Sequence, residues 1–586
     1  MLSDFQSYWS LLRRYLSARR RLLSLLAMLL FGTIALQLVK PQLLRYFIDT
    51  SQARGSQAAL LGAAILFLVA ATAQRLAEVG TTYVGESVGW HATNQLRADL
   101  AAHLLNLDLD FHKAHTPGEL IERVDGDVTA LANFFSQLTV RILGNLILML
   151  AILLLLFRED SRVGVALALY IVATLVGLRL IQSPAVRRWV IAREAQAAQL
   201  GFLEERLAGT EDIRANGATD HVMHQLLVLM RRVLHAERRA ELMRTVTYGV
   251  THVTYASAFV AGLGIGASLY LRGQISIGTV YLITAYVGLL AQPIEAIRGQ
   301  IDDLQKASAS VGRISRLFEL EPRVVEQRAP VALPRETGRD TAPSLAFHNV
   351  SFSYEGQDTV LHNVTFNLAP GRVLGLLGRT GSGKSTLTRL LFRLYDPTAG
   401  TIALDGIDLR QLPMAELRQR VGMVTQDVQL FHATIRDNLT FWDSKIPDEQ
   451  LLDTLRELGL WGWFETLPEG LDTVLHGGRE LSAGEAQLLA LARVFLKDPG
   501  LVILDEASSR LDPATEQRLE RALDRLLVGR TAIVIAHRLA TVQRADEIMV
   551  LEDGQVVEHG DRMALAAHPN SRFDRLLQTG LEEVLT

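Results

Sequence analysis

The sequence contains no cysteine among its 586 residues, which excludes disulfide bonds, thiol catalysis and cysteine-ligated metal sites. An excess of charge is also missing, because the formal net charge is only −4, and this gives no electrostatic basis for binding nucleic acid. The 15 histidines show no spacing typical of metal ligands. Apolar residues, in contrast, are abundant: 49% of the chain is hydrophobic and the mean hydropathy is +0.19. The chain is longer than a single domain with one compact hydrophobic core usually is, so at least two domains are predicted.

The apolar residues are concentrated in the first part of the chain. Residues 1–320 carry long hydrophobic stretches, whereas residues 345–586 have the mixed composition of a soluble α/β domain. Residues 321–344 are rich in Pro, Arg and Glu, which is typical of a linker. This contrast predicts a membrane half joined to a soluble half.

The N-terminal region is predicted to contact the membrane surface and not to be a cleaved signal. The arginines at 19–21 precede the first long apolar stretch, which places this flank in the cytoplasm by the positive-inside rule. A surface helix packed on its own protein is the alternative to an interfacial helix. Residues 4–16 place four apolar side chains on one helical stripe: Phe5, Trp9, Leu12 and Leu16.

Six segments are long and apolar enough to cross a membrane. A helix needs about 20 residues to span the hydrocarbon core. The candidates lie at about 22–48, 58–105, 128–157, 162–207, 243–271 and 277–318. Short polar breaks at residues 51–57, 158–161 and 272–274 separate them in pairs and are predicted to be outer loops.

The inner connections are predicted to be much longer than the outer ones. The second to fifth segments continue as charged, amphipathic helix beyond their apolar parts. About 45 helical residues span roughly 70 Å, over twice the thickness of the membrane, so these helices must protrude into the cytoplasm. Residues 111–120 and 209–217 connect them, and each combines helix breakers with a short helical piece. Both are expected to touch a cytoplasmic domain.

Several ionisable residues lie near the predicted inner-leaflet level of the spans. Charge within a span is costly and often faces a cavity, so contact with a transported compound is one interpretation. The alternative is that these side chains snorkel to the interface or lie below the membrane. The residues are Arg75, Glu78, Arg141, Arg179, Glu295 and Arg298.

The soluble half contains a complete phosphate-binding loop. A short apolar strand at 374–377 leads into the loop, and a helical segment follows it. Glycines allow backbone N–H groups to surround phosphates, and the helix N-terminus favours their negative charge. Lys384 is expected to reach the β- and γ-phosphates, and Ser385 to ligate Mg²⁺. The loop reads Gly378-Arg379-Thr380-Gly381-Ser382-Gly383-Lys384-Ser385.

Two further strands are predicted to deliver catalytic groups. The strand at 501–504 ends in Asp505, which can bind Mg²⁺ through water. Glu506 follows it and can orient and deprotonate the attacking water. The strand at 531–536 delivers His537, which could contact the γ-phosphate. A lone histidine is more often structural, so its assignment depends on the wider pattern.

This wider pattern resembles the ATP-binding cassette (ABC) exporters. Residues 480–493 begin Glu-Leu-Ser-Ala-Gly-Glu, which is similar to the LSGGQ signature and its helix, and residues 509–512 resemble the D-loop. In the membrane half, residues 116–120 and 289–294 look like exporter-type segments. The resemblance covers nearly the whole chain and is most specific in the soluble half.

The resemblance implies a fold and a set of site residues. The fold is an all-α membrane domain of six helices at 1–320, the linker at 321–344, and an α/β P-loop NTPase, the ABC cassette, at 345–586. ATP and Mg²⁺ are the implied cofactors. Tyr354 would stack on adenine, and Gln426 would link Mg²⁺ and water to the membrane domain. The implied catalytic residues are Glu506, His537 and Gln426, the implied metal ligands are Ser385, Gln426 and Asp505, and the implied nucleotide-binding residues are Tyr354, Gly378, Arg379, Thr380, Gly381, Ser382, Gly383, Lys384, Ser385, Thr386, Ser482 and Gly484.

The resemblance also implies a mechanism that needs two chains. Each ATP would lie between the phosphate loop of one cassette and the signature of the other. Closure of the cassettes would pull on the two inner connections, as coupling helices, and open the cavity outward. The implied function is ATP-driven export of hydrophobic or amphipathic compounds, such as drugs, lipids or peptides, across the plasma or inner membrane, with the cassette in the cytoplasm. An ATP-gated channel or a regulatory subunit is the alternative.

The signature departs from the family pattern, because it reads LSAGE. Ala483 adds a Cβ where a glycine backbone approaches phosphate, and Glu485 places a carboxylate near a polyphosphate, which is unfavourable. Residues 476–479 also lack the glutamate usual in the exporter loop. In heterodimeric members of the family, an altered signature on one subunit commonly pairs with an altered catalytic carboxylate on the other. A heterodimer is therefore predicted, and a homodimer that tolerates LSAGE at both sites is the alternative.

Overall fold

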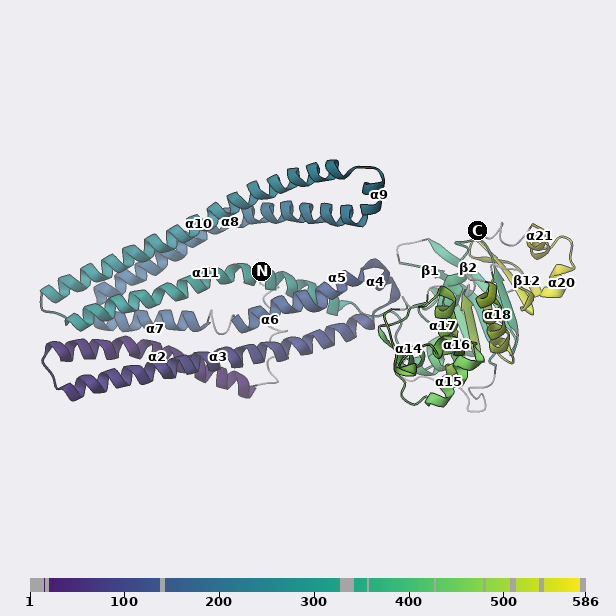
Figure 1. Ribbon diagram of the computed structural model, residues 1–586, viewed down its shortest axis with the longest axis horizontal. Helices are drawn as coiled ribbons and strands as arrows, with labels where there is room; N and C mark the ends of the chain where they lie inside the picture. The colour runs from purple at the N-terminus through teal and green to yellow at the C-terminus, as the bar shows by residue number, and fades with distance from the viewer. Residues whose placement is uncertain are drawn as a thin grey trace. The chain divides into compact units, whose positions relative to one another are not determined.

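The computed structural model forms two compact units along the chain (Figure 1). The first unit comprises residues 1–105 and 117–319, and the second comprises residues 106–116 and 320–586. Most of the helix predicted at 4–16 and most of the linker lie outside the described residues. The structure describes residues 15, 20–137, 143–326, 342–355, 358–425, 428–477, 481–505, 513–536 and 542–579.

The first unit is built from long helices. α2 runs beside α3, and α8 runs beside α10, with α9 at the tip of the second pair (Figure 1). The elements are α2 (Arg20–Gln52), α3 (Gln57–Leu105), α5 (Pro117–Ile121), the π-helix η2 (Glu122–Asp127), α6 (Val128–Gln137), α7 (Gly144–Glu159), α8 (Ser161–Ala208), α9 (Thr210–Ala215), α10 (Thr219–Leu271) and α11 (Ile277–Glu319).

Five of these helices are long and apolar enough to cross a membrane. They are α2, α3, α8, α10 and the part of α11 over Ile277–Ala296, and they match five of the six predicted segments. The third predicted segment, at 128–157, covers α6 and α7, and residues 138–142 between these helices, Arg141 included, lie outside the described residues. The predicted outer loops coincide with the ends of α2, α7 and α10.

The structure describes the side chains of four of the six ionisable residues of the predicted spans. Arg75 and Glu78 pair with each other on α3, with Nη1 and Oε2 2.8 Å apart. Arg179 and Glu295 are exposed on α8 and α11, and the side chain of Arg298 lies outside the described residues. A role for any of them in cargo contact stays a prediction.

A buried carboxylate ties η2 to α11 within the first unit. Asp127 is only 4% exposed. Its two oxygens accept hydrogen bonds from Ser310 Oγ at 2.8 Å and from Arg313 Nε at 2.9 Å. Arg123, one turn earlier, lies 3.4 Å from the same carboxylate. A buried charge is tolerated when it is paired and hydrogen-bonded, and this one has both kinds of partner.

The second unit combines three sheets with shorter helices. The sheets have the strand orders β2-β1-β4-β5, β12-β11-β3-β10-β9-β6 and β7-β8. The strands are β1 (Leu345–Ser353), β2 (Thr359–Leu368), β3 (Val373–Leu377), β4 (Ala399–Leu404), β5 (Ile407–Asp408), β6 (Val421–Val424), β7 (Ala433–Thr434), β8 (Val474–Leu475), β9 (Leu501–Asp505), β10 (Thr531–Ile535), β11 (Glu547–Glu552) and β12 (Gln555–Asp561). The helices are α4 (Leu109–Ala114), α12 (Lys384–Leu391), η4 (Leu409–Gln411), α13 (Met414–Arg420), α14 (Ile435–Thr440), α15 (Asp448–Glu457), α16 (Trp461–Phe464), η5 (Gly470–Asp472), α17 (Ala483–Lys497), α18 (Pro513–Leu527), α20 (Arg562–Ala566) and α21 (Arg572–Thr579).

The six-stranded sheet positions the site. β3 pairs in parallel with β10, and β10 pairs in parallel with β9. All residues of β3 and β10 are buried, which is why both strands read as continuous apolar runs. Because parallel strands end at the same edge of a sheet, the segments that follow β3, β9 and β10 meet there.

Candidate functional site

The phosphate-binding loop lies between β3 and α12, in the predicted strand–loop–helix setting. Its backbone depends on glycine at three positions, because φ is +151° at Gly378, +87° at Gly381 and +102° at Gly383. A Cβ at Gly378 would lie 2.3 Å from the carbonyl oxygen of Leu551, so this position also excludes larger residues by space. The loop is therefore fixed in a shape that only this glycine pattern allows.

Lys384 opens α12 and is almost fully buried, with 7% of its surface exposed. Its ammonium donates hydrogen bonds to the carbonyl oxygens of Gly378 at 2.5 Å and Arg379 at 3.0 Å. These bonds hold the charge inside the loop, where it stabilises any phosphate that the loop surrounds.

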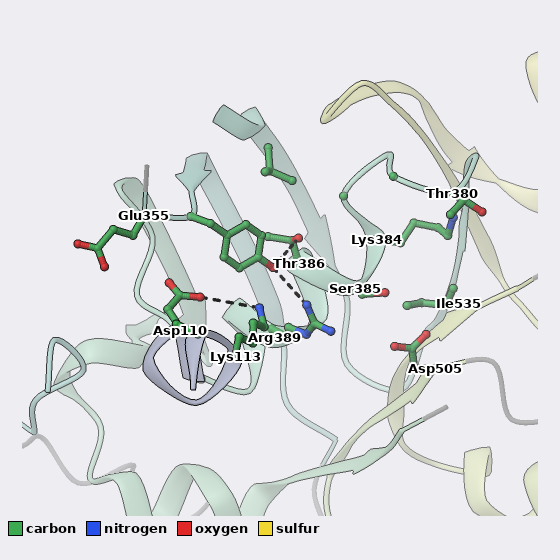
Figure 2. Close-up of a pocket in the computed structure, with 15 residues that line it drawn as sticks. Asp110, Lys113, Glu355, Thr380, Lys384, Ser385, Thr386, Arg389, Asp505 and Ile535 are labelled. Atoms are coloured by element: carbon green, nitrogen blue, oxygen red, sulfur yellow. Dashed lines mark hydrogen bonds and ion pairs between the residues drawn. The ribbon is translucent and has the colours of Figure 1, made fainter. Parts of the chain in front are cut away.

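A cavity of about 770 Å³ opens beside the loop, and several elements line it. Lys384 and Ser385 come from α12, and Asp505 from the end of β9. Figure 2 shows these three residues at one end of the cavity, and Lys113 and Asp110 of α4 at the other end. The cavity thus has one end defined by Lys384, Ser385 and Asp505 and a second end defined by Asp110 and Lys113.

Tyr354 lines the second end of the cavity. Its hydroxyl lies 2.9 Å from Thr386 Oγ1 and accepts a hydrogen bond from Arg389 Nη1 at 3.3 Å. Tyr395 packs edge-on against its ring, with the ring centroids 5.3 Å apart. The ring is therefore held in place within the same cavity as the phosphate loop, as stacking on a base requires.

The three predicted catalytic residues, Gln426, Glu506 and His537, lie outside the described residues. They follow β6, β9 and β10 closely in the chain, and these strands are parallel neighbours. Ser385 and Asp505 offer a hydroxyl and a carboxylate, the hard oxygen ligands that suit Mg²⁺. Among the described residues, no group of three or more His, Cys, Asp or Glu side chains could hold a metal.

The signature residues Ser482 and Gly484 are not among the described residues that line this cavity. Ser482 is the N-cap of α17, and it forms a reciprocal capping box with Glu485. The Glu485 carboxylate accepts hydrogen bonds from the backbone N–H and the hydroxyl of Ser482, and Glu485 N–H donates to Ser482 Oγ at 3.3 Å. Glu485 therefore has a local structural role that the sequence analysis did not identify, although the S-x-x-E pattern is its signal.

The sequence analysis also missed Asp110, Lys113 and Arg389 as lining residues of the cavity. Lys113 lies in the inner connection at 111–120, of which residues 111–116 belong to the second unit and residues 117–120 to the first. Nothing in its local sequence indicates a nucleotide site, because the cavity brings together segments that are far apart in the chain.

Known proteins match both halves of the chain. Residues 361–509 match the ABC transporter family, and residues 23–294 match the ABC transporter transmembrane region. A probable multidrug resistance ABC transporter ATP-binding/permease protein, YheH, of Bacillus subtilis is 30% identical and covers 84% of this chain and 72% of its own length. An ATP-dependent lipid A-core flippase of Syntrophus aciditrophicus is 28% identical, covering 94% of this chain and 90% of its own length. The solved structure of a bacterial Atm1-family ABC exporter with ATP bound has the same fold, with a TM-score of 0.81 at 24% identity over 96% of this chain and 98% of that chain.

Proposed function

This chain belongs to the ABC transporter family, and we propose that it is one subunit of a heterodimer that exports hydrophobic or amphipathic compounds. It is an ATP-hydrolysing exporter subunit, a multi-pass membrane protein whose cassette lies in the cytoplasm. The proposal therefore concerns what the family leaves open: the partner chain, the division of labour between two ATP sites, and the cargo. We also propose the limits of the three parts of the chain: the membrane domain at 1–320, the linker at 321–344 and the cassette at 345–586.

In this proposal the chain supplies the competent half of one ATP site. Lys384 binds the β- and γ-phosphates, and Tyr354 stacks on the base. Glu506 orients and deprotonates the attacking water, and His537 contacts the γ-phosphate. Among the described residues, Lys384, Tyr354 and Asp505 line one cavity, and this supports the assignment of Lys384 to the phosphates and Tyr354 to the base.

Mg²⁺ fits the oxygen ligands at the phosphate end of the cavity. Ser385 and Asp505 would hold it there, with Gln426 as the third protein residue. When bound, Mg²⁺ neutralises charge on the β- and γ-phosphates. The protein's own contribution is to hold the phosphates against Lys384 and the backbone N–H groups of the loop.

The observation that carries the heterodimer is the hydrogen bonding of Ser482. A signature serine that binds the γ-phosphate of a second chain needs a free hydroxyl and no nearby negative charge. Here the hydroxyl of Ser482 donates to the carboxylate of Glu485 at 2.8 Å. Contact with phosphate would have to replace this bond and bring a carboxylate close to the polyphosphate, which costs electrostatic energy. This chain's signature is therefore suited to complete a weaker site on a different partner.

The proposed cargo is hydrophobic or amphipathic, namely drugs, lipids or peptides. The names of two relatives refer to multidrug resistance and to a lipid A-core flippase, and lipids and many drugs are apolar or amphipathic molecules. Two of the long apolar helices, α2 and α3, also carry exposed large apolar side chains that include Leu66, Leu68 and Phe31. Such surfaces suit lipid and apolar cargo, but they do not distinguish between cargo types.

The heterodimer is tested by native mass spectrometry of the complex purified from its own membranes through a tag on this chain. We expect this chain, of 64.7 kDa, together with a second ABC half-transporter of different mass. The partner's sequence should carry an intact LSGGQ signature. Two copies of this chain and no other, with full transport activity, would contradict the heterodimer and require LSAGE to work at both sites.

A further inference from the structure

The part of the first inner connection that contains α4 packs on the cassette. Residues 106–116 belong to the second unit, although α3 and α5 on either side of them belong to the first. Leu109 packs against the cassette core, and Asp108 accepts hydrogen bonds from the backbone N–H groups of Arg323 at 2.8 Å and Val324 at 3.4 Å. These contacts fix α4 within the cassette unit.

The Lys113 side chain of α4 lies at the second end of the cavity. Lys113 lines the cavity, and its ammonium lies 4.5 Å from the ring centroid of Tyr354 and 5.2 Å from that of Tyr395. The side chain of Lys113 is 49% exposed, and its ammonium lies 3.8 Å from the nearer Asp110 oxygen. The charge is therefore oriented by aromatic and acidic neighbours and is still accessible from the cavity.

Tyr395 makes this arrangement rigid. Its hydroxyl donates a hydrogen bond to Asp110 Oδ1 at 2.9 Å, and the residue is 6% exposed. Burial raises the pKa of the Tyr395 phenol, and the adjacent Asp110 carboxylate raises it further, so the phenol stays protonated and keeps donating. Asp110 is thereby held beside Lys113, and Lys113 beside Tyr354.

We propose that Lys113 is a nucleotide-contacting residue whose ammonium binds the base and ribose end of ATP, so that the first inner connection forms part of the ATP site. An ammonium donates hydrogen bonds to ring nitrogens and hydroxyl oxygens, and it is attracted to the face of an aromatic base. Figure 2 shows Lys113 at the end of the cavity away from Lys384, which already serves the phosphates. The inference rests on the proposed role of Tyr354 at the base.

The contact has a consequence for coupling. Lys113 can reach the nucleotide only while α4 is docked on the cassette. ATP binding therefore stabilises the docked connection by the same factor by which docking strengthens ATP binding. A residue of the membrane half's own connection would in this way report the occupancy of the nucleotide site.

The test compares two ligands that share the phosphates but not the base. The equilibrium dissociation constants of ATP and of inorganic tripolyphosphate are measured on the purified full complex with Mg²⁺, for wild type and for Lys113→Met, which keeps the aliphatic stem. We expect ATP to bind roughly three- to fivefold more weakly to the variant and tripolyphosphate to bind unchanged. Lys113→Arg should retain most of the affinity for ATP, because it keeps the charge.

Lys445→Met is the matched control, because Lys445 is an exposed cassette lysine that does not line the cavity. It should leave both constants unchanged. Unchanged ATP binding in Lys113→Met would overturn the proposal, because it would mean that Lys113 does not contact ATP. An equal loss of affinity for ATP and tripolyphosphate would also overturn it, because such a loss reflects general damage to the site or a long-range effect of the charge on the phosphates. Tyr354→Ala tests the role of Tyr354 separately from that of Lys113. If this variant shows no loss of affinity that is specific to ATP, Tyr354 does not stack on the base. The role of Lys113 is still decided by comparing ATP and tripolyphosphate in Lys113→Met.

Discussion

Glu485 accepts hydrogen bonds from Ser482 through one carboxylate oxygen, from the backbone N–H at 2.9 Å and from the hydroxyl at 2.8 Å. The residue that departs most from the family signature is therefore bonded to the residue that should bind phosphate. The capping box stabilises the start of α17. The same bond occupies the hydroxyl that a second chain's ATP would need.

Replacing the charge of Glu485 should strengthen ATP binding at the site that this signature completes. Glu485→Gln keeps a side chain that can serve in a capping box, so the thermal unfolding midpoint should not change. Removal of one negative charge near the phosphates should tighten ATP binding roughly three- to tenfold. Equilibrium ATP binding to the full complex checks this, in a Glu506→Gln background that prevents turnover. Glu449→Gln, at an exposed position of α15, is the control, and an affinity no tighter than in that control would contradict the charge argument.

The proposed general base should be essential for turnover and dispensable for binding. Glu506→Gln should lower the ATPase rate of its site by about 10²- to 10⁴-fold, the range expected when a general base is lost. ATP affinity should stay at the wild-type level, because Lys384 and the loop glycines are unchanged. Steady-state hydrolysis and ATP binding on the same preparation give the two readings. A variant that keeps most of its activity would remove Glu506 from this role.

Breaking the buried pair between η2 and α11 should destabilise the first unit. Burial by itself raises the pKa of Asp127, but hydrogen bonds from Arg313 and Ser310 and the positive charges of Arg313 and Arg123 lower it below its ordinary value. The carboxylate is therefore ionised at neutral pH. Asp127→Asn leaves Arg313 without its partner charge and should cost about 3 kcal/mol of unfolding free energy. The thermal unfolding midpoint in detergent should fall clearly.

Asp125→Asn is the matched control for this variant, because Asp125 lies in the same π-helix. Its side chain is 72% exposed and lies 3.2 Å from Arg97. The Arg97 side chain is only 20% exposed, but the Asp125 carboxylate lies mostly in solvent, so the pair contributes about 1 kcal/mol or less and the midpoint should change little. If Asp127→Asn were as stable as Asp125→Asn, the buried pair would not hold η2 to α11.

The half-buried Lys497 predicts that the free energy of unfolding rises with pH in a defined window. Burial, together with the nearby charge of Arg418, lowers the pKa of Lys497 from its ordinary 10.5 to about 8. Between these values the unfolded chain holds a proton that the folded chain has released, so the free energy of unfolding increases as pH rises from 8 to 10.5. Below about pH 8 Lys497 is protonated in the folded state as well, so the folded state keeps the free-energy cost of desolvating this charge.

Lys497→Met removes this titration. The difference in unfolding midpoint between wild type and Lys497→Met should therefore shift in favour of wild type as pH rises from 8 to 10. Lys445→Met, an exposed lysine of the same unit, should show the same pH dependence as wild type. A difference that stays constant with pH would mean that the pKa of Lys497 is close to its ordinary value in the folded protein.

Much of the site was predictable because its chemistry depends on residues that are close together in the sequence. Lys384 and Ser385 follow the loop glycines directly, and a glycine pattern that allows positive φ can be read from neighbouring residues. Asp505 ends an apolar strand, and the structure places it in the same cavity. The capping box of Ser482 and Glu485 was equally local, and it was overlooked because the signature was considered only for its contact with phosphate.

By itself the sequence determined the apolar spans, the phosphate loop and the strand ends that carry the predicted catalytic groups, because each depends on the spacing of residues close together in the chain. Only the tertiary structure decided that Asp110 and Lys113 share a cavity with Tyr354 and Lys384. The same holds for Asp127, whose partner Arg313 is far along the chain. Such pairs arise from how helices and strands pack, and packing of distant segments leaves no periodic signal in the sequence around either partner.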